Sequence, residues 1–101
     1  MAFTDRFNFE NLHNEAEKLV ISELGRQLQA YNGPICMCND CVVDMAAYAL
    51  NAVKPLYSVS LLGTMYVSRA MEDEKYAASI QEAVFTAIEK IRKNPSHEAG
   101  T

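Results

Sequence analysis

The sequence predicts a mainly α fold, a small three-helix domain with a short irregular or β segment between the second and third helices. Apolar residues recur at helical spacing in three stretches, helix-stopping residues separate these stretches, and one short run alternates apolar and polar side chains as a strand does. The chain has 101 residues, of which 50% are hydrophobic and 22% are charged. This is room for one small domain, which we expect at residues 1–95.

The first helix is expected from about Phe9 to Ala30. Its apolar residues gather on one side, with most of the charged residues opposite. They are Leu12, Ala16, Leu19, Val20, Leu24 and Leu28. The sequence Asn32-Gly33-Pro34 should end this helix, because glycine accepts a left-handed cap geometry and proline cannot continue a helix.

The second helix is expected to begin at Asn39 or Asp40, since either side chain can cap the helix by accepting a free backbone N–H. It must end before Pro55, which disfavours helical geometry at the residue before it. The residues between these limits are apolar on nearly every side. This pattern indicates a helix at the centre of the domain that a second subunit also partly covers.

A short β element is expected at Tyr57–Leu61, where apolar and polar residues alternate. The third helix is expected to start as early as Ser68, to be under way by Tyr76 and to end at Asn94-Pro95. Its buried stripe consists of Ile80, Val84, Ala87, Ile88 and Ile91. Residues 96–101 form a polar tail that we expect to be disordered.

The charge balance excludes two classes of function. Nine basic and thirteen acidic side chains give a net charge of -4, whereas general nucleic-acid binders and anionic-membrane binders need a basic surplus. The start of the chain has no signal-peptide pattern, and the longest apolar run, Met45–Leu50, is too short to span a bilayer. We therefore expect a cytoplasmic protein, in which cysteines stay reduced.

The three cysteines, Cys36, Cys38 and Cys41, form a C-x-C-x2-C cluster in a loop that runs onto the second helix. A helix N-terminus favours thiolates, and three sulfurs this close can share one zinc ion. A closed zinc site takes four protein ligands. The candidates for the fourth are His13, His97, Asp40, Asp44 and a residue of another subunit. The alternative is that these are small, half-buried thiols that pack a tight turn.

A second feature is the absence of any acidic residue between Asp44 and Glu72. Basic, hydroxyl, aromatic and amide side chains occur in this stretch, and these groups hold the phosphates, ring faces and base edges of nucleotides. The candidate ligand-binding residues are Arg69, Lys54, Tyr57, Asn51, Tyr66 and Ser68. If Ser68 caps the third helix, Arg69 and the first free N–H groups form an anion site. The alternative is that the tyrosines are core residues and the charge asymmetry is a chance fluctuation.

No catalytic arrangement is indicated. His13 and Cys41 lack a third residue that would orient them, and the chain has no phosphate loop and no dinucleotide fingerprint. We therefore predict no catalytic residues and no enzymatic activity.

From the cysteine cluster onward, several residues stand at fixed offsets. The cluster is followed by Asp44, by the helix end Ala49-Leu50-Asn51 and by Pro55-x-Tyr57. This pattern resembles the signature of the ComFB family, the late-competence-development proteins. The similarity is densest over residues 35–57 and extends more loosely over most of the chain.

The resemblance implies a compact, mainly helical homodimer without enzymatic activity. Some relatives hold zinc through the cysteines, while others, in cyanobacteria and other bacteria, are receptors for the second messenger cyclic di-GMP, with links to motility, natural competence and cell size. Carried onto this chain, the zinc role falls on the three cysteines. Relatives often have arginine directly before the motif tyrosine, where this chain has Leu56. If that arginine clamps a phosphate, Arg69 or Lys54 must replace it here, or affinity falls.

The leading expectation is a receptor that binds cyclic di-GMP and signals through an unidentified protein partner. The net charge still leaves room for a small dianionic nucleotide in a locally basic pocket. The alternative is an interaction module of the competence or DNA-uptake machinery, completed by dimerisation or by zinc, with no nucleotide ligand. Thiol redox sensing through the cysteine cluster is a third reading.

Overall fold

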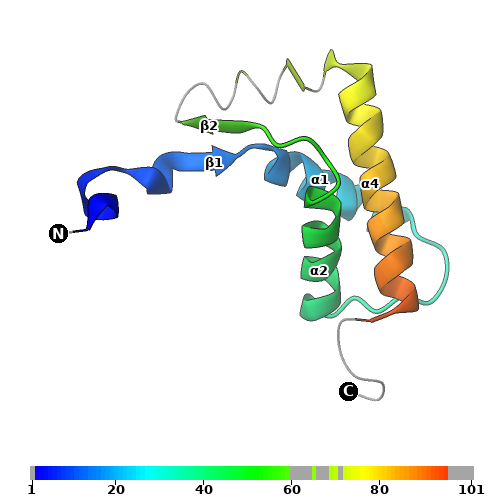
Figure 1. The fold of residues 1–101 in the computed structure, drawn as a ribbon. Helices are drawn as coiled ribbons and strands as arrows, with labels where there is room; N and C mark the ends of the chain where they lie inside the picture. The colour runs from blue at the N-terminus through cyan, green and yellow to red at the C-terminus, as the bar shows by residue number, and fades with distance from the viewer. Residues whose placement is uncertain (1, 60–64, 66–68, 71, 96–101) are drawn as a thin grey trace.

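The computed structural model describes residues 2–59, 65, 69–70 and 72–95 of the chain. Within this part, the fold is mainly helical, as predicted, with a two-stranded ribbon at one side (Figure 1). The elements are η1 (Phe3–Arg6), η2 (Phe9–Asn11), β1 (Leu12–Asn14), α1 (Ala16–Ala30), α2 (Asn39–Leu50), β2 (Tyr57–Val59) and α4 (Glu74–Lys93). The short β segment expected between the second and third helices is β2, and its partner β1 precedes α1.

The core lies where α1, α2 and α4 meet, and each helix contributes one apolar stripe to it. The largest fully buried side chains are Met45, Ile88, Val20, Val84 and Cys41. The stripe predicted for the third helix is buried throughout, from Ile80 to Ile91. Full burial of each larger aliphatic side chain stabilises the fold by about 1.5–3 kcal/mol, so the helix packing is the main source of stability.

The predicted start of the first helix at Phe9 is wrong, because η2 and β1 occupy that part of the chain. Leu12 fits the helical stripe in sequence, but it lies in β1 opposite Val59 of the antiparallel ribbon. Asn14 then ends the extended segment, since its Oδ1 accepts the backbone N–H of Ala16 at 3.1 Å. This bond satisfies one of the N–H groups that a helix start leaves without a partner.

The predicted end of the first helix at Ala30 is confirmed. Tyr31 leaves the helix with an extended backbone, and Gly33 adopts a φ of 126° in the turn that follows. A side chain at that φ would be strained, which is why glycine suits the position.

The second helix occupies the predicted range, but neither Asn39 nor Asp40 caps it. Asn39 is already the first residue of α2, and Cys38 is the N-cap. Its extended backbone lets Sγ accept the backbone N–H of Cys41 at 3.4 Å. A thiol therefore takes the place that an Asn or Asp oxygen usually fills.

The third predicted helix corresponds to α4, which begins at Glu74 and is under way by Tyr76, as expected. Asp73 caps it, because its carboxylate accepts the backbone N–H groups of Lys75 and Tyr76 at 2.9 and 3.3 Å. The N-cap of α4 is thus Asp73, and the expected earlier start and cap at Ser68 lie outside the described residues. The predicted end is confirmed, with Asn94 as the C-cap.

The ribbon of β1 and β2 pairs Leu12 with Val59, His13 with Ser58 and Asn14 with Tyr57. Of the predicted strand at Tyr57–Leu61, the first three residues form β2, and the last two lie outside the described residues, as does the tail at 96–101. Together with η1 and η2, the ribbon forms an arm that extends away from the helices (Figure 1). Within the described part of the chain, no helix is both long and apolar enough to span a bilayer.

Candidate metal centre and cationic surface

The three cysteines come together where the loop after α1 enters α2. Their Sγ atoms all lie within 4.8 Å of one another. A tetrahedral zinc ion with Zn–S bonds of 2.3 Å holds its sulfurs about 3.8 Å apart, so small side-chain rotations suffice for all three to bind one ion. Cys41 is fully buried and the other two are half-buried. The donor set therefore fits zinc.

The local fold explains why these sulfurs face one point. Cys38 is the N-cap of α2, and Cys41 lies one helical turn later on the same side. The helix N-terminus stabilises negative charge, which favours thiolates at this end of α2. The sequence-based prediction of a thiol cluster on the first turn of the second helix is confirmed in its geometry.

The fourth ligand is not supplied by the residues that the structure describes. Among the described residues, the three cysteines are close enough to bind one metal ion together. Asp40, Asp44 and His13 do not belong to this set of possible ligands. His97 lies outside the described residues. His13 is paired with Ser58 in the ribbon, so the structure does not bring it to Cys41 as an imidazole–thiol pair.

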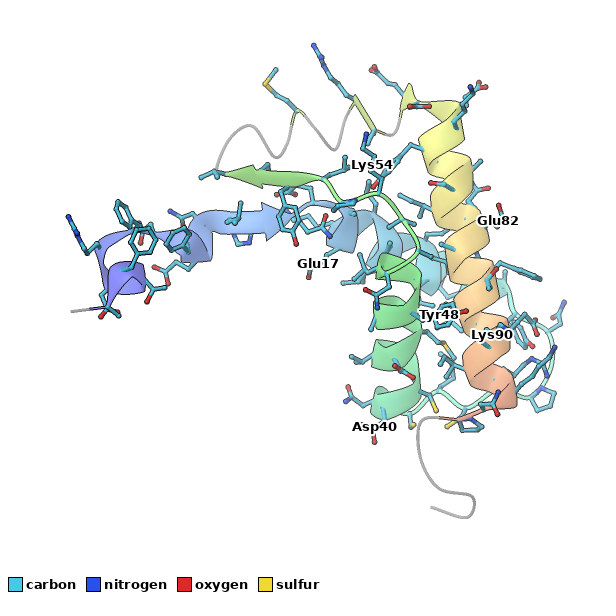
Figure 2. The ribbon with its side chains drawn as sticks, in the orientation of Figure 1. Glu17, Asp40, Tyr48, Lys54, Glu82 and Lys90 are labelled. Atoms are coloured by element: carbon cyan, nitrogen blue, oxygen red, sulfur yellow. The ribbon has the colours of Figure 1, made fainter. Side chains whose placement is uncertain are left out.

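Three of the predicted ligand-binding residues lie at the other end of α2. Asn51 is the C-cap of α2, and Lys54 and Tyr57 follow it in the segment that leads to β2. All three side chains are exposed, as is Arg69, which precedes α4. Figure 2 places Asp40, on the first turn of α2, and Lys54 at opposite ends of the helix. Tyr66 and Ser68 lie outside the described residues.

Hydrogen bonds from two other elements hold the backbone of this segment. The hydroxyl of Tyr76 in α4 donates to the carbonyl of Lys54 at 2.7 Å. The backbone N–H of Leu56 donates to Asn14 Oδ1 at 2.8 Å, and the carbonyl of Leu56 accepts from the backbone N–H of Glu15 at 2.7 Å. The segment between α2 and β2 is thus fixed from both sides, and the side chain of Leu56 packs against the core.

The next residue, Ser58, completes this anchoring. Its hydroxyl donates to Glu15 Oε1 at 3.0 Å, and both side chains are buried. Lys18 Nζ lies 3.3 Å from Glu15 Oε2. The hydrogen bond from Ser58 is the main cause that lowers the pKa of Glu15 below its ordinary value of 4.5, and Lys18 acts in the same direction. Glu15 therefore stays ionised at neutral pH.

The expected anion site at the start of the third helix is not formed by α4. Its first N–H groups already bond to Asp73, and Glu72 and Glu74 add negative charge beside it. A phosphate there would meet like charge. Any phosphate contact from Arg69 is therefore independent of the N-terminus of α4.

Three residues that position this surface were missed by the sequence analysis: Asn14, Glu15 and Tyr76. An Asn just before a predicted apolar helical stripe is a capping signal, and it would have indicated Asn14 if the helix start had been placed correctly. Nothing in the sequence separates Glu15 from the exposed charges near it. The contact between Tyr76 and Lys54 depends on how α4 packs beside α2, which the sequence does not show.

The fold and the site define a small helical domain with a thiol cluster at one end of α2 and a cationic, aromatic segment at the other. The family model for "Late competence development protein ComFB" matches residues 13–95, and the chain belongs to this family. A search of curated proteins finds no match.

Among solved structures, the chain is similar to the late competence protein ComFB from Bacillus subtilis. The TM-score is 0.73 at 22% sequence identity, and the match covers 89% of this chain and 98% of that one. At this identity the likeness shows a common fold. The resemblance stated from the cysteine cluster and the Pro55-x-Tyr57 motif is confirmed at the level of the family.

Proposed function

We propose that this protein is a non-enzymatic, cytoplasmic receptor that binds cyclic di-GMP and passes its occupancy to a protein partner. The observation that supports the proposal best is the fixed segment between α2 and β2. Its backbone is bonded at Lys54 and Leu56, while the side chains of Asn51, Lys54 and Tyr57 face solvent. A segment that is already ordered loses little conformational entropy when a ligand binds.

The exposed groups have the chemistry that a cyclic dinucleotide needs. Lys54 and Arg69 supply cations for its two phosphates, Asn51 supplies an amide for a base edge, and the ring of Tyr57 supplies a stacking surface. The side chain of Tyr57 is 61% exposed, so it is not a core residue. This favours the ligand-binding interpretation over the packing alternative for Tyr57. We include Tyr66 and Ser68 in the proposed site.

Zinc, in this proposal, has a structural role only. The cysteine cluster lies at the first turn of α2 and the cationic segment follows its last residue. The 12 residues of α2 span about 18 Å at 1.5 Å per residue. A zinc ion bound by Cys36, Cys38 and Cys41 is therefore too far away to touch the nucleotide, and it would fix the loop between α1 and α2.

Isothermal titration calorimetry of the purified protein with cyclic di-GMP tests the proposal. We expect saturable binding, with no comparable heat from cyclic di-AMP or GMP, because the site is proposed to read both the guanine edge and the paired phosphates. The absence of both binding heat and a thermal shift at high cyclic di-GMP concentration would overturn the proposal.

The second candidate is an interaction module of the competence or DNA-uptake machinery, dimeric and without a nucleotide ligand. The family description and the cysteine cluster favour it, because a metal can complete the fold of a small domain. It predicts a protein partner whose capture does not depend on cyclic di-GMP. The two candidates are separated by the calorimetric result, and by whether added cyclic di-GMP changes the recovery of the partner.

A further inference from the structure

We infer that the C-terminal half of α4 is a docking surface for an acidic, amphipathic segment of a protein partner. The segment places an apolar side chain on Phe85 and carboxylates beside Lys90 and Lys93. The inference rests on the proposed function, since a receptor that signals needs a partner, and it names the chemistry of that partner. The surface, which we call the α4 groove, is lined by Phe85, Thr86, Glu89, Lys90, Lys93 and Asn94.

The α4 groove follows one face of the helix up to its C-cap. Its lining residues fall into two rows in which successive members are four residues apart, so their side chains lie next to one another along the helix. The groove has a volume of about 360 Å³, and its lining is mainly apolar. This volume is at the lower end of the range for small-molecule pockets, so the groove suits one or two side chains of a peptide.

Phe85 provides the apolar anchor point of the groove. Its side chain is 59% exposed, whereas Val84 and Ile88 on the opposite face are fully buried in the core. The aliphatic stems of Lys90 and Lys93 extend the apolar surface, because lysine keeps its ammonium group in water while its methylene groups cover neighbouring atoms. An aromatic ring exposed in this way can contribute more to binding a partner than to folding.

The rim of the groove is cationic. Glu89 accepts hydrogen bonds from Arg92 Nε at 3.0 Å and Nη2 at 2.6 Å, so its charge is already paired. Lys90 and Lys93 are exposed, and neither forms an ion pair with a residue that the structure describes. Three basic side chains and one acidic one give this end of α4 a charge of +2, in a chain whose net charge is -4. An acidic segment is therefore attracted to this end and repelled by the rest of the surface.

The dipole of α4 explains only part of this arrangement. Basic side chains in the last turn stabilise the negative end of a helix, which accounts for the two lysines. The dipole does not account for an exposed phenylalanine beside them. A segment that is both apolar and acidic uses both features. A nucleic acid or an anionic membrane is a poorer occupant, because a large polyanion also meets the acidic remainder of the chain.

The groove also sets the length of the segment. Phe85 and Lys93 are eight residues apart, which is about 12 Å along the helix axis. Four residues of an extended chain, or two turns of a helix, span this distance. The expected partner segment therefore has one large apolar residue within about two helical turns of two or more carboxylates.

The groove is separate from the proposed nucleotide site. Lys90 stands on the half of α4 away from Lys54 (Figure 2). Tyr76, which bonds to the Lys54 carbonyl, precedes Lys90 by 14 residues, or about 21 Å of helix. A partner can therefore dock on the groove without touching the nucleotide.

Selection of a random peptide library against the full chain, without cyclic di-GMP, tests the inference. We expect enriched peptides that combine several Asp or Glu residues with one large apolar residue. The most enriched peptide is labelled with fluorescein and titrated by fluorescence anisotropy. Phe85→Ser, Lys90→Glu and Lys93→Glu should each weaken its binding at least about tenfold. Lys75→Glu is the matched control, because it makes the same charge change on an exposed lysine at the other end of α4.

The salt dependence gives a readout that altered folding would not imitate. Affinity for the peptide should fall as the salt concentration rises, and it should fall less steeply in Lys93→Glu than in the parent or in Lys75→Glu. Enriched peptides that are basic or uncharged would overturn the inference. Equal affinity in the parent, Phe85→Ser and Lys93→Glu would do the same.

The other possible occupants have their own signatures. Binding of a single-stranded oligonucleotide or of phosphatidylglycerol vesicles that is lost in Lys90→Glu, with no binding of acidic peptides, would overturn the inference in favour of that occupant. Concentration-dependent NMR shifts of the Phe85 and Lys90 amides without peptide would assign the groove to a second copy instead. Because no nucleotide is present in these assays, failure of the docking surface and failure of cyclic di-GMP binding are distinguishable results.

Discussion

The hydroxyl of Ser58 donates a hydrogen bond of 3.0 Å to Glu15 Oε1, and this buried pair joins β2 to the start of α1. The neighbouring bonds from Glu15 to Leu56 and from Leu56 to Asn14 run between the same two segments. Because the exposed residues Lys54 and Tyr57 flank these contacts, the pair also determines where the proposed ligand-binding side chains stand.

The Ser58→Ala variant should lose stability at neutral pH and part of its acid sensitivity. The pKa of Glu15 in the folded protein is lowered from 4.5, so its contribution is present above that pH and is lost as the pH falls through the folded value. Without the hydroxyl, the folded pKa moves back toward the unfolded one. Urea unfolding measured by circular dichroism at several pH values down through this range checks the shift, with Ser22→Ala, on the exposed side of α1, as the control.

Identical pH dependence in the parent protein and in Ser58→Ala would contradict this account of Glu15. Equal destabilisation by Ser22→Ala would show that the loss is not specific to the buried pair.

The Tyr76→Phe variant should free the backbone of Lys54. It removes the 2.7 Å hydrogen bond to the Lys54 carbonyl, and the free energy of unfolding should fall by about 0.5–1.5 kcal/mol. Affinity for cyclic di-GMP should also fall severalfold, because the binding segment is less ordered before the ligand arrives. The control is Tyr48→Phe on the exposed side of α2, whose hydroxyl bonds to no residue that the structure describes. Unchanged affinity for cyclic di-GMP in Tyr76→Phe would contradict the idea that the prior ordering of this segment contributes to ligand binding.

The Cys38→Ser variant should lose bound zinc and thermal stability together. Protein purified without added zinc is expected to contain about one ion per chain by elemental analysis, and the variant close to none, since one of three thiolates is removed. Met37→Ser in the same loop is the control, because Met37 is exposed and outside the cluster. Metal-free parent protein would reject the zinc role. Normal folding and ligand binding with all three cysteines replaced by serine would dispose of both the zinc and the redox interpretations.

The helices were predictable where apolar residues recur at helical spacing over a long stretch, because this spacing determines which side chains are buried. The stripe of α4 from Ile80 to Ile91 is an example, since 20 residues of regular spacing leave little alternative. The short strand β1 was not predictable in the same way. Leu12 continues the apolar period of α1, and only its pairing with Val59, far along the chain, makes the segment extended.

In the candidate site, too, the features set by neighbouring residues in the sequence were predictable, and those set by the packing of distant elements were not. The cysteine cluster was predictable because its spacing is local, and the exposure of Tyr57 agrees with the nucleotide interpretation that the charge pattern suggested. The residues that hold the segment in place, Asn14, Glu15 and Tyr76, come from other elements. Their contacts exist only after α1 and α4 have packed, so no local pattern indicates them.

The central claim is that Arg69 and Lys54 bind a cyclic dinucleotide, and calorimetry of single variants with cyclic di-GMP tests it most directly. Arg69→Ala should weaken binding more than tenfold, because a charge-assisted phosphate contact is worth about 1.5–3 kcal/mol, and Lys54→Ala should weaken it as well. Lys90→Ala, on the half of α4 away from Lys54 in Figure 2, should bind as the parent does. No binding by the parent protein, or equal affinity in all three variants, would contradict the account.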